Sequence, residues 1–430
     1  MRKLSVWMEI KGKAVYVGQI TGHDSNNACF SYAEDYRSRS DSRPVSLSLP
    51  LEERTFSPSR TENYFEGLLP EGFTRKCVAR RLHADEGDYL SILSALGKEC
   101  LGAVKILEEG VAEDAPEYRP LSPQEVEDLA REGAVESASI VAKSHLSLTG
   151  ASGKVGLYYD EQKEQWYLPI GDAPSTHIVK QSHVRLSRIV TNEQLCLQTA
   201  KRLGIVVPDS FILNLSDSGR NPGEEDVLLA TRRYDRIWQD SCRNLNGLPV
   251  PLRLHQEDFA QALGIAAARK YERGDEEYMA RMFRLLQLYS ANPLEDQLRL
   301  WNICIFNYLI GNTDNHIKNL SLLYSADLKS IRLAPAYDLV STVVYDGGNE
   351  DMAFSVGGEH NIHAISRKSF EKAAKEIGLG AKMAMNRFDA MVFGFEKALI
   401  SAGEELKEQG FAEASHMSES ILNKGGIARQ

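Results

Sequence analysis

The sequence predicts an α+β fold with two lobes and a further β-rich region at the N-terminus. The first half contains short runs with period-2 alternation or β-branched residues, as in Leu4 to Ile20. From His255 onward the apolar residues recur at helical spacing instead. We therefore predict a β-rich subdomain over residues 1–108, a mixed β-sheet lobe over 124–245 and an all-helical lobe over 246–430.

Composition is that of a soluble globular protein. The 430 residues are 43% hydrophobic and 26% charged. No run approaches the ~18 apolar residues of a membrane span, and Glu9 interrupts the N-terminus before a signal-peptide core could form. The six cysteines, at positions 29, 77, 100, 196, 242 and 304, show neither paired nor metal-ligand spacing. These features predict a cytoplasmic protein with no membrane partner.

Charge argues against general nucleic-acid binding, because the formal net charge is −10. A local basic run extends from Arg75 to His83. Its spacing is typical of the solvated side of a helix. We expect no direct reading of DNA sequence by this chain.

The N-terminal elements are predicted in chain order. The strands at 4–10 and 14–20 are joined by a turn at Lys11–Lys13, and Pro44 to Leu51 is predicted as a further strand. A short helix ends at residues 64–70, before the basic helix. Glu109 to Pro123 is polar with three prolines and is interpreted as a linker. Ser122 with Glu125 predicts the capped start of a helix that runs to about Glu132.

The next region reads as a mixed sheet followed by helices. Strands are expected at 155–159, 165–169, 176–180, 209–215 and 227–234, with a helix at 191–203 that ends at Gly204. Helices are expected near 256–264, 276–289, 293–310, 368–377 and 385–403.

Most of the candidate catalytic residues lie between Gly311 and Asn319. Asp314 and Asn319 are separated by four residues, and Asp338 follows two short strand-like runs at 320–324 and 330–335. Phosphoryl transfer requires this set, because the first Asp can orient the attacking hydroxyl while Asn and the second Asp hold Mg²⁺. The alternative is structural, since Asn and Asp are common in turns and caps. Position 312 is Asn where eukaryotic-type protein kinases carry His, so the chain is not an ordinary member of that family.

Further residues fit a nucleotide site. Lys180 closes a β-branched strand and Glu193 lies near the start of the following helix, which is the order of the kinase Lys–Glu ion pair. The Gly-rich stretch Ser147–Lys154 could bring backbone N–H groups close to phosphates. It resembles a Walker loop only superficially, because the gap between its glycines is too short. Each residue alone could equally be a surface charge or a turn.

Together these features indicate bilobal protein-kinase architecture, and in combination they resemble the HipA toxin kinases of bacterial type II toxin–antitoxin pairs. The resemblance spans nearly the whole chain. It rests on residues 46–51, 68–70 and 102–104, the Gly-rich loop, 176–180, 233–236, 311–319 and 337–338. It implies a two-lobed serine/threonine protein kinase, distantly related to lipid kinases, with an added N-terminal subdomain.

The resemblance also implies roles for individual residues. Asp314 would be the catalytic base, Asn319 and Asp338 would hold Mg²⁺, and Lys180, paired with Glu193, would contact the ATP phosphates. The backbone of 232–234 would meet the adenine edge, although relatives often carry an acidic residue where this chain has Arg232. The remaining implied ATP-site residues are Thr149, Gly150, Ala151, Ser152, Gly153, Lys154, Arg233, Tyr234, Asp235 (near the ribose), His316, Lys318 and Tyr337. Ser147 would be an inactivating autophosphorylation site, with Ser144, Thr149 and Ser152 as alternatives.

The resemblance finally implies partners and cofactors. The cofactors would be ATP and Mg²⁺, and the partner a small dimeric helix-turn-helix antitoxin of the HipB type that holds operator DNA, with this chain as co-repressor near the nucleoid. The substrate would be a protein Ser or Thr, as in an aminoacyl-tRNA synthetase, and its phosphorylation would arrest growth and promote persistence. Two alternatives remain open: a small-molecule or lipid kinase on the same core, and a non-catalytic co-repressor scaffold.

Overall fold

The computed structural model describes residues 1–110, 115–131, 153–182, 186–216, 222–239 and 243–430. These residues form two compact units. The first contains 1–183, 230–268 and 323–330, and the second contains 184–229, 269–322 and 331–430. The predicted boundary at 245/246 differs from this division, because 184–229 groups with the helical unit and 246–268 groups with the β-rich one.

The first unit begins with a four-stranded antiparallel sheet in the order β3-β2-β1-β4. The side chains of Leu4, Val6 and Met8 in β1 are fully buried, as period-2 alternation requires. This confirms the predicted N-terminal hairpin. The strands are β1 (Arg2–Ile10), β2 (Lys13–Gly22), β3 (Cys29–Tyr32) and β4 (Val104–Glu108).

Four helices accompany this sheet: α1 (Glu34–Arg37), α2 (Pro58–Phe65), α3 (Gly72–Arg81) and α4 (Tyr89–Leu96). The basic run lies on α3, as predicted. The predicted strand at Pro44–Leu51 is wrong, because this segment forms bends and turns. Side chains satisfy its backbone in place of a ladder: the Tyr32 hydroxyl accepts from Val45 N at 2.9 Å and donates to Leu49 O, and Glu257 accepts from Leu47 N at 3.1 Å.

A second sheet follows the order β5-β7-β6-β8-β10-β9. β10 crosses the boundary between the units, its last three residues belonging to the first and the others, with β9, to the second. The strands are β5 (Glu117–Pro120), β6 (Lys154–Asp160), β7 (Gln165–Ile170), β8 (His177–Gln181), β9 (Ser210–Asn214) and β10 (Val227–Arg232).

β5 corrects the predicted linker. Tyr118 is buried and its ring centroid lies 4.2 Å from that of Tyr158, so aromatic packing holds this polar segment on the sheet edge, where Pro120 is tolerated. The helix predicted after Ser122 is present as α5 (Pro123–Arg131), and Ser122 and Glu125 exchange hydrogen bonds at its start.

Small elements complete the first unit. They are β11 (Arg236–Ile237), β12 (Asn244–Leu245), β13 (Leu248–Pro249), β14 (Leu252–Arg253), β15 (Gln256–Asp258) and α8 (Phe259–Leu263). The helix expected over 256–264 therefore begins only at Phe259, because Asp258 accepts from Gln261 N at 2.8 Å and caps it.

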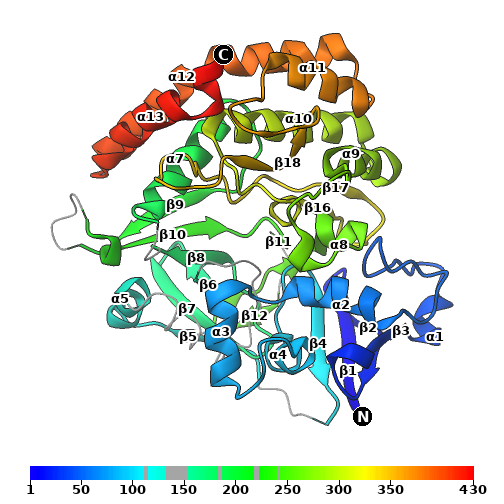
Figure 1. The fold of residues 1–430 in the computed structure, drawn as a ribbon. Coiled ribbons are helices and arrows are strands. Elements are labelled where there is room, and N and C mark those ends of the chain that lie inside the picture. Colours follow the sequence, from blue (N-terminus) through cyan, green and yellow to red (C-terminus); the bar gives the residue numbers. More distant parts are fainter. Residues whose placement is uncertain (111–114, 132–152, 183–185, 217–221, 240–242) are drawn as a thin grey trace. The chain divides into compact units, whose positions relative to one another are not determined.

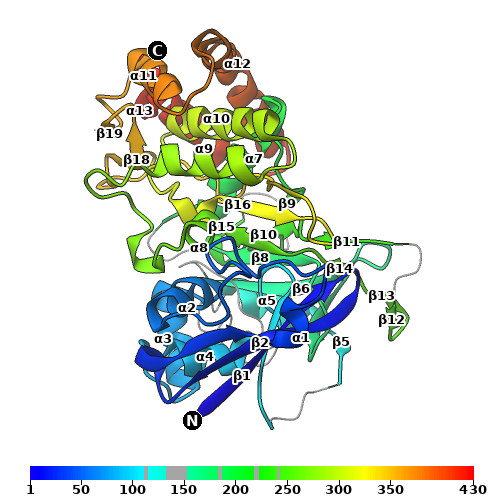
Figure 2. The same cartoon turned by 90° about the vertical axis from the view of Figure 1, so that its right-hand side faces the viewer.

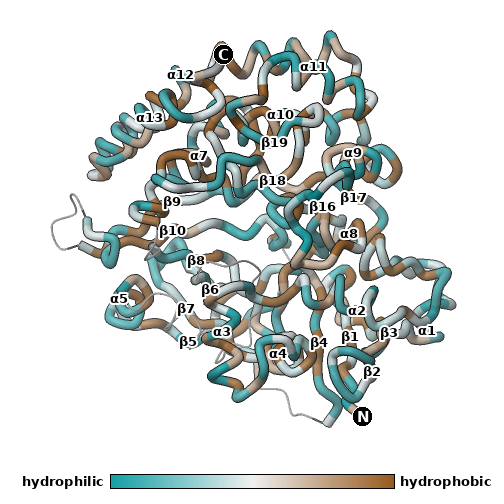
Figure 3. Tube along the Cα trace, in the orientation of Figure 1, coloured by the Kyte–Doolittle hydropathy of each residue, from teal (hydrophilic) through white to brown (hydrophobic). Residues whose placement is uncertain are grey.

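The second unit is built around α10, which packs against α9 and α12 (Figure 2). The hydrophobic colours of Figure 3 gather around α10, in keeping with the buried run from Trp301 to Ile310. The helices are α7 (Ile189–Arg202), α9 (Tyr278–Tyr289), α10 (Pro293–Ile310), α11 (Arg367–Glu376), α12 (Ala381–Glu408) and α13 (Glu413–Lys424).

The C-terminal part is not all-helical as predicted, because it also contains strands. β16 (Ser321–Tyr324) and β17 (Ile331–Leu333) pair where the sequence indicated two strand-like runs. β18 (Asp351–Val356) and β19 (Glu359–Asn361) form a further hairpin that the sequence reading missed. The α+β fold class itself is confirmed.

Candidate active site

The 311–319 loop begins where α10 ends. Gly311 has φ +70°, and a Cβ there would lie 2.4 Å from Val343 Cγ2. Glycine adopts this backbone conformation at little cost and fits the space. The loop that carries Asp314 therefore departs from a rigid buried helix at a defined point.

Asn312 explains the departure from the eukaryotic kinase pattern. Its side chain is buried, and its Nδ2 donates to Asn307 Oδ1 at 2.7 Å and to Asp338 O at 3.3 Å. Its Oδ1 accepts from Asp314 N at 3.1 Å. One amide thus bonds to the main chain of both acidic residues, and the structure brings Asp314 and Asp338 together as predicted.

The Asp314 carboxylate is exposed to solvent. Thr313, just before it, is held by hydrogen bonds from its backbone N and its hydroxyl to Thr342 Oγ1, at 2.9 and 2.7 Å. The Tyr271 hydroxyl donates to Asp314 Oδ1. No motif marked Tyr271, because only the tertiary structure brings residues 43 positions apart into contact.

Asn319 and Asp338 provide an oxygen set that suits Mg²⁺. Asn319 Nδ2 donates to Asp314 O at 3.1 Å, and this bond leaves its Oδ1, the atom that a cation would need, unused. Asp338 is partly exposed and has φ +53°. Among the described residues there is no cluster of three or more His, Cys, Asp or Glu side chains for a metal. Two protein ligands are sufficient for Mg²⁺, which keeps waters and phosphate oxygens in its shell.

The loop is further held by contacts of three predicted ATP-site residues, His316, Lys318 and Tyr337. His316 and Lys318 are largely buried, and the His316 ring meets the Tyr271 ring edge-on, with centroids 5.2 Å apart. Tyr337 donates to Lys318 O at 2.9 Å and lies 2.6 Å from Ser321 Oγ. The contacts of Tyr337 connect the 337–338 segment to the 311–319 loop and the strand after it. The contact of His316 and Lys318 with phosphate stays a prediction.

The first unit holds the predicted phosphate-binding lysines. Lys154 in β6 lies directly opposite Lys180 in β8 in the antiparallel register, so both side chains leave the same face of the sheet. Both are partly exposed, and Gly153 immediately precedes the pair. Directly opposite cations repel unless an anion joins them. Thr149, Gly150, Ala151, Ser152 and Ser147 lie outside the described residues. Glu193 is buried on α7 in the second unit, and its ion pair with Lys180 stays a prediction.

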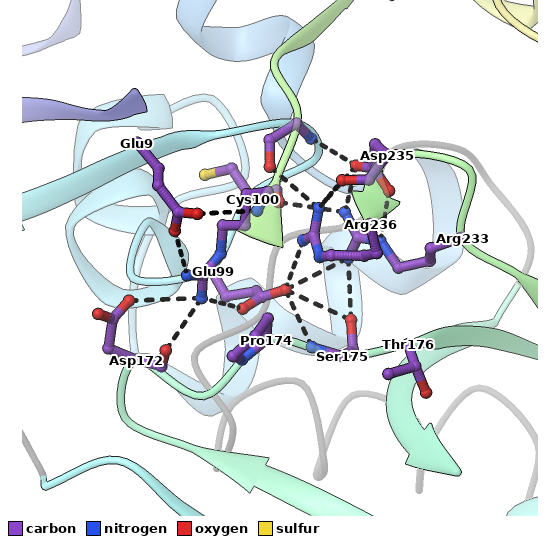
Figure 4. Close-up of polar contacts among 12 residues, drawn as sticks. Glu9, Glu99, Cys100, Asp172, Pro174, Ser175, Thr176, Arg233, Asp235 and Arg236 are labelled. Atoms are coloured by element: carbon purple, nitrogen blue, oxygen red, sulfur yellow. Dashed lines mark hydrogen bonds and ion pairs between the residues drawn. The ribbon is translucent and has the colours of Figure 1, made fainter. Parts of the chain in front are cut away.

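The 232–236 segment corrects the implied roles of two side chains. Arg232 is exposed and Tyr234 partly buried, but the side chains of Arg233 and Asp235 are buried and bonded to each other at 2.7 Å (Figure 4). The Asp235 carboxylate also accepts from Gly102 N at 2.9 Å. We assign Asp235 and Arg233 side chains to this internal network rather than to ribose or phosphate contacts.

Electrostatics keep this network charged. Burial opposes ionisation, yet the guanidinium groups of Arg253, Arg236 and Arg233 lower the pKa of Glu99 to about 2. Burial likewise opposes the Asp235 carboxylate, and Arg233 and Arg236 more than offset it, so its pKa lies well below the usual range. Both carboxylates are therefore charged at neutral pH.

The backbone of the same segment is the predicted adenine contact. Arg233 N donates to Thr176 O at 2.9 Å toward the neighbouring strand. Arg232 is the last residue of β10, and Tyr234 lies in the turn that follows it. The contact of their backbone groups with adenine stays a prediction.

Comparison with known proteins gives matches along the chain. Residues 6–107 match the model of the HipA N-terminal domain, and residues 146–399 match that of the HipA-like C-terminal domain. A Sinorhizobium fredii protein named "Putative kinase Y4mE" is 30% identical over 100% of this chain and 99% of its own length. The serine/threonine-protein kinase toxin HipA of Shewanella oneidensis is 28% identical over 78% of this chain and 75% of its own length.

A solved structure confirms the fold. The HipA–HipB–operator DNA complex of Shewanella oneidensis MR-1 contains a chain that matches with a TM-score of 0.77 at 22% identity, covering 99% of this chain and 97% of that one. Within the described residues, no helix combines the length and apolar character needed to cross a membrane.

Proposed function

The chain belongs to the HipA family of kinases, and from this premise we propose that it transfers the γ-phosphate of Mg²⁺–ATP to a Ser or Thr of a protein. The observation that carries the proposal is the Asn312 side chain, which holds the main chain of Asp314 and Asp338 within one hydrogen-bond network. Chemistry of this kind needs an acceptor-orienting carboxylate and a metal-binding carboxylate in fixed relation. A scaffold with no catalysis would not need the exposed, supported Asp314.

The proposed roles in the reaction are divided among the following groups. The backbone of 232–234 binds adenine, and Lys154 and Lys180 neutralise phosphate charge. Asp314 orients the acceptor hydroxyl and accepts its proton, while Asn319 and Asp338 hold Mg²⁺. A bound Mg²⁺ would supply positive charge against the negative charge that develops on the phosphates.

The relatives support a proposed biological setting. The matched Shewanella oneidensis structure contains HipA with HipB and operator DNA. We propose that this chain likewise acts as the toxin of a type II module, with a HipB-like antitoxin dimer that carries most of the DNA contact, in a bacterial cytoplasm and near the nucleoid. Ser147 is proposed as the residue whose autophosphorylation inactivates the kinase, because a phosphate there would repel ATP. An aminoacyl-tRNA synthetase is the proposed class of target.

The test is a phosphoproteomic comparison of cells that express the chain with or without its antitoxin, combined with ³²P transfer by the purified protein. We expect one or a few Ser/Thr sites to appear in arrested cells and to disappear with Asp338→Ala. Transfer only to small-molecule or lipid acceptors would replace the protein-kinase assignment by the first alternative. Growth arrest or tight operator repression that survives Asp338→Ala without any phosphate transfer would favour the scaffold.

A further inference from the structure

The loop between α4 and β4, in the HipA N-terminal domain, enters the buried network of Figure 4 through Glu99. Glu99 Oε1 accepts from Arg236 Nη2 at 2.8 Å and from Arg233 Nη1 at 3.3 Å. Its Oε2 accepts from Arg253 Nη2 at 2.8 Å. One carboxylate from the N-terminal domain therefore forms ion pairs with three buried arginines of the 230–268 segment.

Gly102 provides a second link from the same loop. Its N–H donates to Asp235 Oδ2 at 2.9 Å, and its C=O accepts from Arg236 Nη1 at 3.2 Å. Gly102 has φ +73°, and a Cβ there would lie 2.7 Å from Gln256 N. The backbone of the α4–β4 loop thus lies directly against the 230–268 segment at Gln256, with no room for a side chain at position 102.

Two of the residues that these contacts reach, Arg233 and Asp235, flank Tyr234 in the proposed adenine-binding segment. Arg233 and Asp235 point into the network, so the main chain at Arg232 and Tyr234 can shift only if the network shifts. The segment that should present its backbone to the purine is therefore held by its inward side chains and not by the sheet alone.

We propose that Glu99 is a positioning residue for nucleotide: it fixes the 232–236 segment so that the Arg232 C=O and the Tyr234 N–H are spaced for adenine. This rests on the proposed ATP-dependent function. Through Glu99 the N-terminal HipA domain would affect nucleotide binding, although none of its residues need contact ATP. Buried charges that lose their partner relocate or draw in water, because an unpaired buried charge is costly. Loss of Glu99 should thus move the segment rather than leave it in place.

The test compares Glu99→Gln in the full-length protein with a matched control, Asp296→Asn. Asp296 is also a fully buried carboxylate whose pKa is lowered by hydrogen bonds to arginine and serine, but it lies at the start of α10 against Arg332 and Arg299. Binding of Mg²⁺–ATP and Mg²⁺–GTP is measured by calorimetry well below each variant's Tm. ATP turnover is measured at saturating nucleotide.

Loss of one adenine hydrogen bond corresponds to roughly tenfold weaker binding, so we expect Glu99→Gln to raise the Kd for ATP by about that factor. The preference for ATP over GTP should shrink in parallel, and kcat should stay within about twofold, since uniform binding is what is lost. Asp296→Asn should lower Tm and leave the Kd and the ATP/GTP ratio unchanged. A general loss of stability would not change purine selectivity.

Two results would overturn the inference: an unchanged Kd and ATP/GTP ratio in folded Glu99→Gln, or equal changes in Asp296→Asn. If Glu99→Gln does not fold, Arg236→Lys replaces it. That variant keeps a cation beside Glu99 but loses the bond to Gly102 O, and the same shift in selectivity is expected, so unaltered binding by it would equally refute the role. Absence of ATP binding by the wild-type protein would instead refute the proposed function itself.

Discussion

Replacement of Asp314 by Asn should lower the rate of phosphate transfer without a matching loss in the free energy of unfolding. Two hydrogen bonds of residue 314 use its main chain: its N donates to Asn312 Oδ1 and its O accepts from Asn319 Nδ2, both at 3.1 Å. Asn keeps these bonds and nearly the same volume, and the side chain is exposed. We therefore expect the free energy of unfolding to change by no more than about 0.5 kcal/mol.

The expected effect on the rate is much larger. A positioned general base contributes about 10²- to 10⁴-fold, which corresponds to roughly 3 to 5 kcal/mol of transition-state stabilisation. The Asn amide can still meet an acceptor hydroxyl but cannot take its proton. The rate of phosphate transfer at saturating ATP should fall by that factor, while the Kd for ATP stays within about twofold.

Asn312→Ala is the contrasting variant. It removes three hydrogen bonds of a buried amide and leaves Asn307 Oδ1 and Asp338 O without this donor. We expect a loss of about 1 to 3 kcal/mol in unfolding free energy together with reduced activity. Single-turnover ³²P transfer and urea unfolding, run on both variants, measure the two quantities. A stable Asp314→Asn variant with near wild-type transfer would show that this residue is not the base.

Three further outcomes are expected. Tyr271→Phe removes a hydroxyl that competes with the acceptor for Asp314 Oδ1, so the acceptor KM should fall by roughly three- to tenfold; an unchanged or higher acceptor KM contradicts this competition. Burial raises the pKa of Glu257 from 4.5 to about 7, so the folded state binds this proton more tightly. Its stabilising contribution is complete below pH 4.5 and lost as the pH rises through 7, by about 3 kcal/mol in total; urea unfolding at pH 5 and pH 8 should show this loss in wild type and not in Glu257→Gln. Incubation with ATP should add one phosphate to the intact mass of wild type and none to Ser147→Ala, and equal mass gain in both would exclude Ser147.

The sequence predicted most elements because their signals are local. The period-2 alternation of β1 and β2 and the buried run that ends at Gly311 depend on neighbours a few residues away. The predicted strand at Pro44–Leu51 failed for the opposite reason. Its backbone is bonded by Tyr32 and Glu257, and the second of these lies more than 200 positions further along the chain.

The proposed catalytic residues could be picked out from the sequence because their spacing reflects the chemistry. Asp314 and Asn319 lie on one loop, and Asp338 follows the strand pair that comes after it, so the motif survives as a short sequence pattern. The pairing of Lys154 with Lys180 was not visible, since the register of two strands is set by the whole sheet.

The sequence by itself determined the family and the fold class, and it predicted the groups proposed to orient a hydroxyl and hold Mg²⁺, because these depend on residue type and local order. Only the tertiary structure decided what the polar side chains around them do. It placed Asp235 and Arg233 inside a network with Glu99, and Tyr271 on the Asp314 carboxylate. A charged side chain bonds to ligand or to protein according to which partners surround it, and those partners come from distant parts of the chain.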